Sequence, residues 1–319
     1  MSDRFLGNWR VLAPLSVLLL AAALYAQTLS YEYVWDDTLL FVGKTGLVNE
    51  PLSWALLSEP VLPGTTYFRP LMFLTMFIEF NVVGQEPMLS HAVNVSILLI
   101  NTLLVYLLAL RLVRVMALPN AVFRAWLAAL LYVVHPALVE SVTWVSGRFD
   151  LMVTMFMLFG LYTAMLDIRP LLKVLLVCLA MMAGLLSKEL AVVMPALLIC
   201  LWLACYGRQY ASPFVAMQQA LVKNGLLLAG MLLTFALYML LRIDAVEAVY
   251  HAQITGAYID IAWGEKRLPL EALKFYLSRT FLPFYDASLM HPIQNIDFDA
   301  IAVRLSAWLA GLAVLMLFV

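Results

Sequence analysis

Long apolar runs, separated by short polar segments, dominate the chain. A helix needs about 20 mostly apolar residues to cross a bilayer, because its backbone polar groups must be satisfied within the segment. We therefore predict an all-α integral membrane protein, a multi-pass helical bundle with about eight spans in a single domain, 1–319. The predicted spans are about 11–29, 90–110, 121–138, 150–167, 171–186, 190–206, 224–241 and 302–319.

Two longer stretches interrupt this pattern, at about 30–89 and 242–301. Within them, apolar segments broken by polar residues are typical of helices that lie along the membrane interface. These segments are Leu47–Leu57, Leu71–Val83 and Leu268–Tyr285. The chain ends at Val319 inside an apolar run, and we interpret this as the truncation of a longer protein.

Basic residues in the short loops predict the orientation, since Lys and Arg favour the cytoplasmic side. If the spans alternate, these residues share one side with the N-terminus: Arg4, Arg10, Arg111, Arg114, Arg124, Arg169, Lys173, Arg208 and Lys223. All acids except Asp3 and Asp167 then lie on the outer side. Acids contribute little to orientation, so their asymmetry favours a polar site on the outer face.

The composition agrees with the apolar pattern and excludes several classes of protein. Hydrophobic residues make up 65% of the chain and charged residues 12%, which excludes a soluble globule. The net charge of −1 gives no basis for nucleic-acid binding. Cys178, Cys200 and Cys205 lie in apolar runs without CxxC spacing, so neither a disulfide framework nor a zinc site is indicated.

Placing an ionisable residue beside a span costs free energy unless the residue is paired or hydrated, so each such residue is a functional candidate. Asp36 and Asp37 directly follow the first span. In an extended segment their carboxylates point to opposite faces, so one of them could enter a cavity as a general base or a metal ligand. An ordinary polar loop is the alternative. Arg69 could clamp a phosphate or extend to lipid headgroups.

A second group of polar residues lies near the outer ends of later spans. A stretch of sixteen residues forms the hinge after the third span and contains His135, Glu140, Arg148 and Asp150. Glu140 and His135 could contact a metal or an acceptor hydroxyl, and Arg148 could pair with Asp150 or with a phosphate. Three further positions complete the group: the Lys188-Glu189 pair between two spans, His91 at the start of the second span and Arg242 at the end of the seventh.

Carboxylates and cations together suit group transfer from a phosphate-bearing lipid. A carboxylate can deprotonate an acceptor hydroxyl, and cations can stabilise the departing phosphate. No GxGxxG, P-loop or GxSxG pattern indicates a nucleotide donor or acyl transfer.

Several motifs resemble those of GT-C glycosyltransferases. The resemblance is closest to the transmembrane and tetratricopeptide-repeat-containing mannosyltransferases and their bacterial relatives, with the protein O-mannosyltransferases more distant. It covers about 25–190 well, although no tetratricopeptide repeats follow. The motifs occur in the order VWDD, YFRPL, NVVGQEPMLSHAVN, HPALVESVTWVSGRFDL and SKE.

The resemblance implies an inverting transfer of sugar from a polyprenyl-phosphate donor to a hydroxyl acceptor, at the periplasmic or lumenal face. Asp36 would be the base or metal carboxylate, supported by Asp37. Glu140 and His135 would line the cavity, and Arg148, Lys188 and Arg69 would hold the lipid phosphate. The need for a divalent cation (Mg²⁺, Mn²⁺ or Ca²⁺, on Asp36 and Glu140) stays open.

Two other classes of protein also place charges in membranes. A transporter or lipid flippase would carry them near the midplane in interrupted helices, whereas here they cluster at one interface. A structural scaffold would not need charges bordering lipid. We favour the enzyme, located in the bacterial inner membrane, or in the endoplasmic reticulum membrane if the source is eukaryotic.

Overall fold

The computed structural model describes residues 3–61 and 67–250, together with residues 277 and 280. By its internal contacts the chain divides into one unit of residues 1–134 and 138–249 and a second of residues 135–137 and 250–319. The description below concerns the first unit, apart from His135 and its contacts within the second. The prediction of a single domain stays a prediction.

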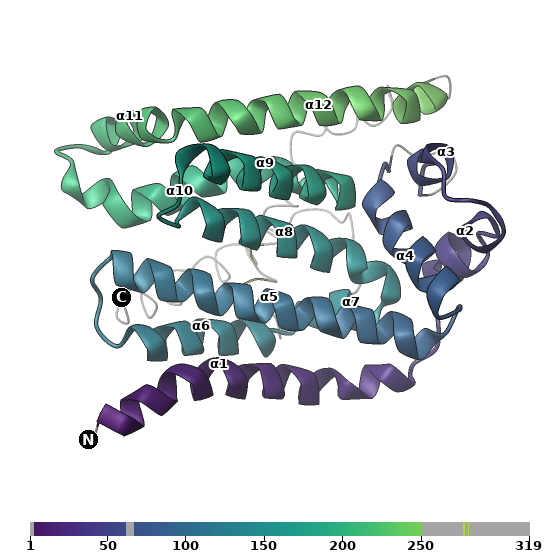
Figure 1. The fold of residues 1–319 in the computed structure, drawn as a ribbon, viewed down its shortest axis with the longest axis horizontal. Coiled ribbons are helices and arrows are strands. Elements are labelled where there is room, and N and C mark those ends of the chain that lie inside the picture. The colour runs from purple at the N-terminus through teal and green to yellow at the C-terminus, as the bar shows by residue number, and fades with distance from the viewer. Residues whose placement is uncertain (1–2, 62–66, 251–276, 278–279, 281–319) are drawn as a thin grey trace, which may run out of the picture. The chain divides into compact units, whose positions relative to one another are not determined.

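The described elements are all helical, with no strand among them (Figure 1). Four of the α-helices have proline at their first position, where the missing N–H costs no hydrogen bond. The α-helices are α1 Asp3–Tyr25, α2 Gly46–Asn49, α3 Trp54–Ser58, α4 Pro70–Val82, α5 Pro87–Val115, α6 Ala121–Val133, α7 Leu138–Thr143, α8 Arg148–Ala164, α9 Pro170–Ser187, α10 Met194–Tyr206, α11 Pro213–Lys223 and α12 Gly225–Tyr250. The short helices are η1 Ala26–Ser30, η2 Thr38–Val42, η3 Val145–Gly147, η4 Glu189–Val193 and η5 Gly207–Gln209.

Within the described residues, six helical segments are long and apolar enough to cross a membrane, which confirms the predicted all-α membrane bundle. They correspond to six of the eight predicted spans, and the last predicted span, 302–319, lies outside the described residues. The segments are Trp9–Ser30, Pro87–Val115, Val145–Ala164, Pro170–Ser187, Glu189–Gln209 and Gly225–Ile243.

The predicted span at 121–138 is a shorter helix in the structure. α6 has 13 residues, so it is about 20 Å long against about 30 Å of hydrocarbon. It ends at Val133, just before His135 and Pro136, and the residue preceding a proline is disfavoured in the helical conformation. The apolar composition indicated this helix correctly, but its length was overestimated.

The first predicted outer stretch is folded onto one end of the bundle. α2, α3 and α4 lie together at one end of the bundle (Figure 1). Pro51 separates α2 from α3, so the predicted helix at Leu47–Leu57 is two short ones. α4 matches the prediction at Leu71–Val83 and buries Met72, Phe73 and Met76.

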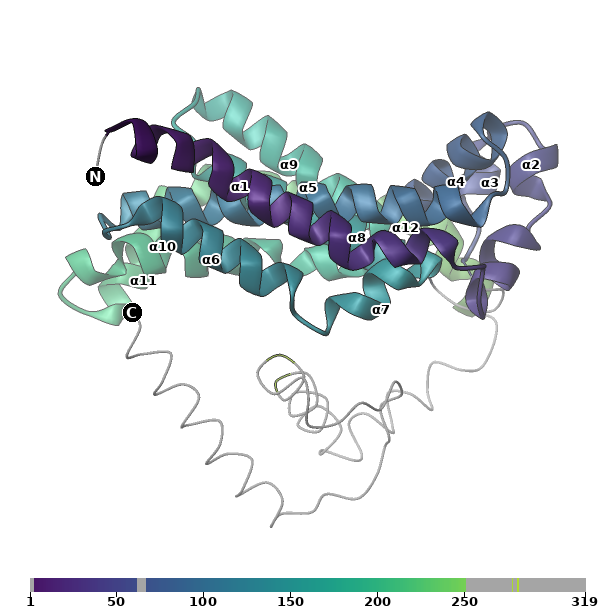
Figure 2. The ribbon, with the colours of Figure 1, turned by 90° about the horizontal axis from the view of Figure 1, so that it is seen from below.

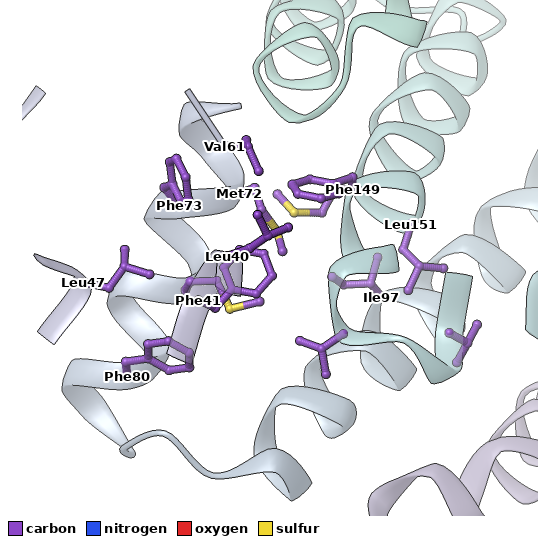
Figure 3. Packing of buried hydrophobic residues seen from close by; sticks show 14 of the residues in the cluster. Leu40, Phe41, Leu47, Val61, Met72, Phe73, Phe80, Ile97, Phe149 and Leu151 are labelled. Carbon is purple, nitrogen blue, oxygen red and sulfur yellow. The ribbon is translucent and has the colours of Figure 1, made fainter. Parts of the chain in front are cut away.

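A hydrophobic cluster joins this outer stretch to the long helices. Phe41, Leu47 and Phe80 lie on its outer side, while Ile97 of α5 and Phe149 of α8 lie on the other (Figure 3). Two further clusters pack most of the remaining helices, one at α1, α5 and α6 and another at α5, α8, α9, α10 and α12. The outer stretch is therefore part of the packed fold.

Successive long helices run in opposite directions along the bundle, as Figures 1 and 2 show. The end that carries α2 to α4 also receives the start of α8 and the end of α9. We call this the acidic end. The opposite end carries the turns between α5 and α6, between α8 and α9, and around α11, and we call it the basic end.

Candidate functional site

A buried arginine is the centre of the polar groups at the acidic end. Arg148 opens α8 and is 0% exposed. Its Nη1 donates to Glu79 Oε2 at 2.7 Å, its Nε to Asn94 Oδ1 at 2.8 Å and its Nη2 to the Ser90 carbonyl oxygen at 2.9 Å. The guanidinium is therefore enclosed by α4, α5 and α8, and it pairs with Glu79 rather than with Asp150.

Glu79, the partner of Arg148, connects the arginine to the first outer loop through further hydrogen bonds. Ser90 Oγ donates to Glu79 Oε1 and lies 2.8 Å from the Tyr33 hydroxyl. Because Ser90 uses its one proton toward Glu79, the Tyr33 hydroxyl must be the donor to Ser90. Burial raises the pKa of Tyr33, which keeps this phenol protonated. Tyr33, Ser90, Glu79 and Arg148 form one chain of hydrogen bonds.

The two neighbouring aspartates have different surroundings. Asp37 is 0% exposed, and its Oδ1 accepts from the Ser146 N–H at 2.8 Å and from Ser146 Oγ at 2.5 Å. Its Oδ2 accepts from the Val34 N–H at 3.2 Å. Asp36 is half-buried, and its carboxylate has no hydrogen bond or ion pair within the described part of the chain. Asp37 is thus occupied in holding the loop on η3, whereas Asp36 is available.

The backbone just before these aspartates is strained. Trp35 has a φ of 49°, a left-handed conformation that costs a non-glycine residue about 1–3 kcal/mol. Its ring packs edge-on against Trp144, with 6.3 Å between ring centroids. Strained residues are common at functional sites, and Trp35 shares this conformation with Ala117 and Asn120 in the turn between α5 and α6.

Cations gather around Glu189 on the other side of the α8 N-terminus. Arg69 and Arg242 each lie 3.7 Å from a Glu189 carboxylate oxygen. The Arg69 guanidinium also lies over the Phe149 ring, 4.2 Å from its centroid, and over Tyr67 at 4.9 Å. Lys188 forms an ion pair with Asp150. The five charged side chains of this group comprise three cations and two carboxylates, so the group is net positive.

One short segment contacts both groups of polar residues. Ser146 binds Asp37 and Arg148 binds Glu79, while Phe149 packs under Arg69 and Asp150 pairs with Lys188. The segment 146–150 therefore joins the acidic loop to the cation group. The sequence predicted seven members of the two groups as site residues: Asp37, Arg148, Asp150, Arg69, Lys188, Glu189 and Arg242.

Three other predicted site residues occupy separate positions. His91 on α5 is 1% exposed, packs edge-on against Tyr31 at 6.2 Å, and lies within electrostatic reach of Asp37 and the Glu32 backbone. Glu140 lies on an exposed part of α7. His135 is half-buried in the α6–α7 turn, where Nδ1 accepts from the Ala137 N–H at 3.2 Å and Nε2 lies 3.0 Å from the Thr280 carbonyl oxygen.

The metal prediction involves Asp36 and Glu140. Within 3–61 and 67–250, no three His, Cys, Asp or Glu side chains come together as a group that could hold a metal ion. The predicted pair would therefore need further ligands, such as water or substrate oxygens, and the metal stays a prediction.

Sequence reasoning missed four members of the buried hydrogen-bonded groups: Glu79, Ser90, Ser146 and Tyr33. Glu79 had a usable signal, because it is an acid within the apolar α4 sequence and a charge there requires a partner. Ser90, Ser146 and Tyr33 carry no such signal, since hydroxyl residues are common in loops and helix ends.

The chain is similar to named mannosyltransferases over part of its length. It is 28% identical over 141 residues to protein O-mannosyl-transferase TMTC1 of mouse and of human, which is 40% of this chain. It is 30% identical over 190 residues to protein O-mannosyl-transferase Tmtc1 of Drosophila melanogaster, which is 57% of this chain. These matches cover 14%, 15% and 21% of the relatives' own lengths.

These relatives confirm the resemblance to the transmembrane and tetratricopeptide-repeat-containing mannosyltransferases that the motifs indicated. No family model matches the chain. No solved structure matches it either.

Proposed function

We propose that this chain takes part in transferring a sugar from a polyprenyl-phosphate donor to a hydroxyl acceptor, at the acidic end of the bundle on the outer face of the membrane. One observation carries the proposal: Asp36 is a half-buried carboxylate without a described partner, placed by a strained turn beside the buried Asp37. The names of the relatives favour mannose as the sugar.

In the proposed reaction, Asp36 accepts the proton of the acceptor hydroxyl. The hydroxyl oxygen attacks the anomeric carbon and forms the new glycosidic bond, while the bond from that carbon to the phosphate oxygen breaks. Polyprenyl phosphate leaves with the bonding electrons, and the configuration at the anomeric carbon inverts. A base in this role contributes typically about 10²–10⁴-fold to the rate.

The cation group supplies the charge that the departing phosphate needs. Arg69 and Lys188 belong to a group that is net positive, and Arg presents a planar fork of donors suited to phosphate. Arg148 supports the site from inside instead, because it is enclosed and its donors are engaged by Glu79, Asn94 and Ser90. Asp37 has a similar supporting role through Ser146.

The substitution Asp36→Asn tests the proposal. We expect transfer to fall by about 10²–10⁴-fold, because an amide cannot accept the proton. The measurement is release of polyprenyl phosphate from a mannosyl-phosphoryl-polyprenol by the purified chain with a Ser/Thr-containing peptide. Thermal unfolding of the variant should match that of the unchanged chain, since Asp36 has no described partner to lose.

Asp167→Asn is the matched control, because Asp167 is an exposed carboxylate at the basic end, paired with Arg111. Its transfer activity should be unchanged. Full activity in Asp36→Asn would reject Asp36 as the base. Movement of the lipid across sealed vesicles without a new glycosidic bond would favour a transporter instead.

A further inference from the structure

A cavity of about 500 Å³ lies at the basic end of the bundle, away from the acidic loop and the cation group. Its walls come from the end of α8, the start of α9, the end of α10 and the junction of α11 with α12. The groups around Asp37 and Glu189 involve the opposite ends of α8 and α9. Because α8 has 17 residues, the two regions lie about 25 Å apart along it.

Two lysines line this cavity without a counter-charge. Neither Lys173 nor Lys223 forms an ion pair within the described residues. The one carboxylate in the wall, Asp167, is already paired with Arg111. Arg111 Nε also donates to the Met165 carbonyl at 3.0 Å, so it satisfies the carbonyl end of α8. The side chains of the wall therefore leave a net positive charge.

The start of α9 adds the positive end of a helix dipole to this charge. Pro170 is the first residue of α9, and the Lys173 N–H is the first to reach back to Arg169, at 3.0 Å. Pro170 and Lys173 both line the cavity, so the positive end of the α9 dipole borders it. A helix N-terminus beside lysines is a favourable environment for an anion such as phosphate.

The remaining wall is aromatic and apolar. Trp202 lies against Tyr206 at 5.3 Å and stacks on Tyr210 at 5.9 Å, and Leu198 and Leu201 continue the same face of α10. Tryptophan and tyrosine are typical of the membrane interface, where headgroups meet acyl chains. A cavity of this volume is in the range that holds a small molecule rather than a single ion.

We propose that this cavity binds the phosphate-bearing headgroup of an anionic lipid, with the phosphate at Lys173, Lys223 and the start of α9. The glycerol and the first part of the acyl chains lie against the aromatic and leucine wall. The site is independent of the proposed sugar transfer, because it shares no residue with it. Free phosphate offers the same charge but lacks an apolar part for this wall.

The test is lipid binding by the full purified chain in detergent. The probe is dioleoylphosphatidylglycerol, with dioleoylphosphatidylcholine as the zwitterionic comparison, and the readouts are bound lipid by native mass spectrometry and lipid-induced rise in Tm. In Lys173→Ala/Lys223→Ala we expect affinity for phosphatidylglycerol to fall about thirtyfold, or roughly fivefold for each lysine. Lys173→Arg/Lys223→Arg should restore most of the affinity, which separates lost charge from lost folding.

The matched control is Arg114→Ala/Arg208→Ala. Both arginines are exposed at the basic end, and neither lines the cavity. This control should bind phosphatidylglycerol within about twofold of the unchanged chain. An equal loss in both double variants, or no loss in the lysine variant, would overturn the proposal.

A test with inorganic phosphate in the same detergent distinguishes a lipid headgroup from free phosphate as the bound anion. Protection from unfolding by phosphate alone, abolished in the lysine variant, would assign the site to a free phosphate and overturn the lipid headgroup. Protection by phosphatidylglycerol with none by inorganic phosphate supports the lipid.

Discussion

Burial decides what each charged residue at the acidic end can do. Arg148 and Asp37 are both 0% exposed and fully engaged, whereas Asp36 is half-buried beside them. A buried charge is tolerated only when it is paired and hydrogen-bonded, and these partners then restrict it to one geometry. Neighbouring residues of the same type can therefore differ in role, one as support and the other as the proposed base.

At the scale of single residues, the Arg148–Glu79 pair gives a testable prediction. Glu79→Gln should lower the free energy of unfolding by about 3–5 kcal/mol, because it leaves the enclosed guanidinium without its counter-charge. Removing both charges, in Glu79→Gln/Arg148→Met, should cost less than Glu79→Gln alone. The measurement is denaturant unfolding of the purified chain in detergent micelles.

Glu59→Gln is the control for this prediction. Glu59 is paired with Lys44 at 2.6 Å but is half exposed, with 52% of its side-chain surface accessible. Its loss should change stability by about 1 kcal/mol or less. A Glu79→Gln variant as stable as this control would show that the Arg148 pair does not hold the acidic end together.

At the scale of elements, the hinge between α7 and α8 sets the site. η3 turns the chain so that Ser146 meets Asp37 while Arg148 enters the space between α4 and α5. Gly147 lies in this turn so close to the preceding helix that a Cβ atom there would come within 2.6 Å of the Ser141 carbonyl oxygen. Backbone atoms cannot rotate out of the way as a side chain can.

Gly147→Ala should therefore destabilise the chain by about 1–3 kcal/mol, because the hinge must shift to make room. Gly225→Ala is the comparison, since a Cβ there meets nothing within 4 Å and alanine favours helix. We expect its Tm to be unchanged or higher. Tm values measured in the same detergent check both variants, and a Gly147→Ala variant as stable as Gly225→Ala would contradict the close contact at the hinge.

At the scale of the whole described bundle, most carboxylates lie at the acidic end, whereas Lys and Arg occur at both ends and predominate at the basic end. The proposed sugar transfer needs the acidic end on the outer face, and the basic loops favour this orientation. The lipid cavity then lies at the cytoplasmic leaflet, where anionic lipids attract lysines. The two proposals thus assign opposite ends of one bundle to different phosphate-bearing molecules.

Cysteine labelling of intact cells tests this orientation. Asn49→Cys lies on an exposed part of α2, and Ala211→Cys lies in an exposed loop between η5 and α11. In a background where Cys178, Cys200 and Cys205 are replaced by alanine, an impermeant maleimide should label Asn49→Cys directly and Ala211→Cys only after permeabilisation. The reverse pattern would place the acidic end in the cytoplasm and remove the basis for an outer-face reaction.

The apolar pattern by itself determined the fold class and most of the membrane helices. Each span needs about 20 apolar residues regardless of its neighbours, so composition is a sufficient signal. It also marked the charged residues near the outer ends of the spans, because a charge beside lipid is costly. The length of α6 was less predictable, since apolar composition continues to Val134 while the helix ends before Pro136.

Only the tertiary structure decided which charges pair and which of them are enclosed. Arg148 is 69 residues from Glu79 in sequence, and Asp37 is 109 residues from Ser146. No local pattern encodes such contacts, because they depend on how α4, the first outer loop and α8 pack together. For the same reason the basic-end cavity was invisible in the sequence: its lysines lie on α9 and α11, and only the packing of α8 to α12 brings them to one wall.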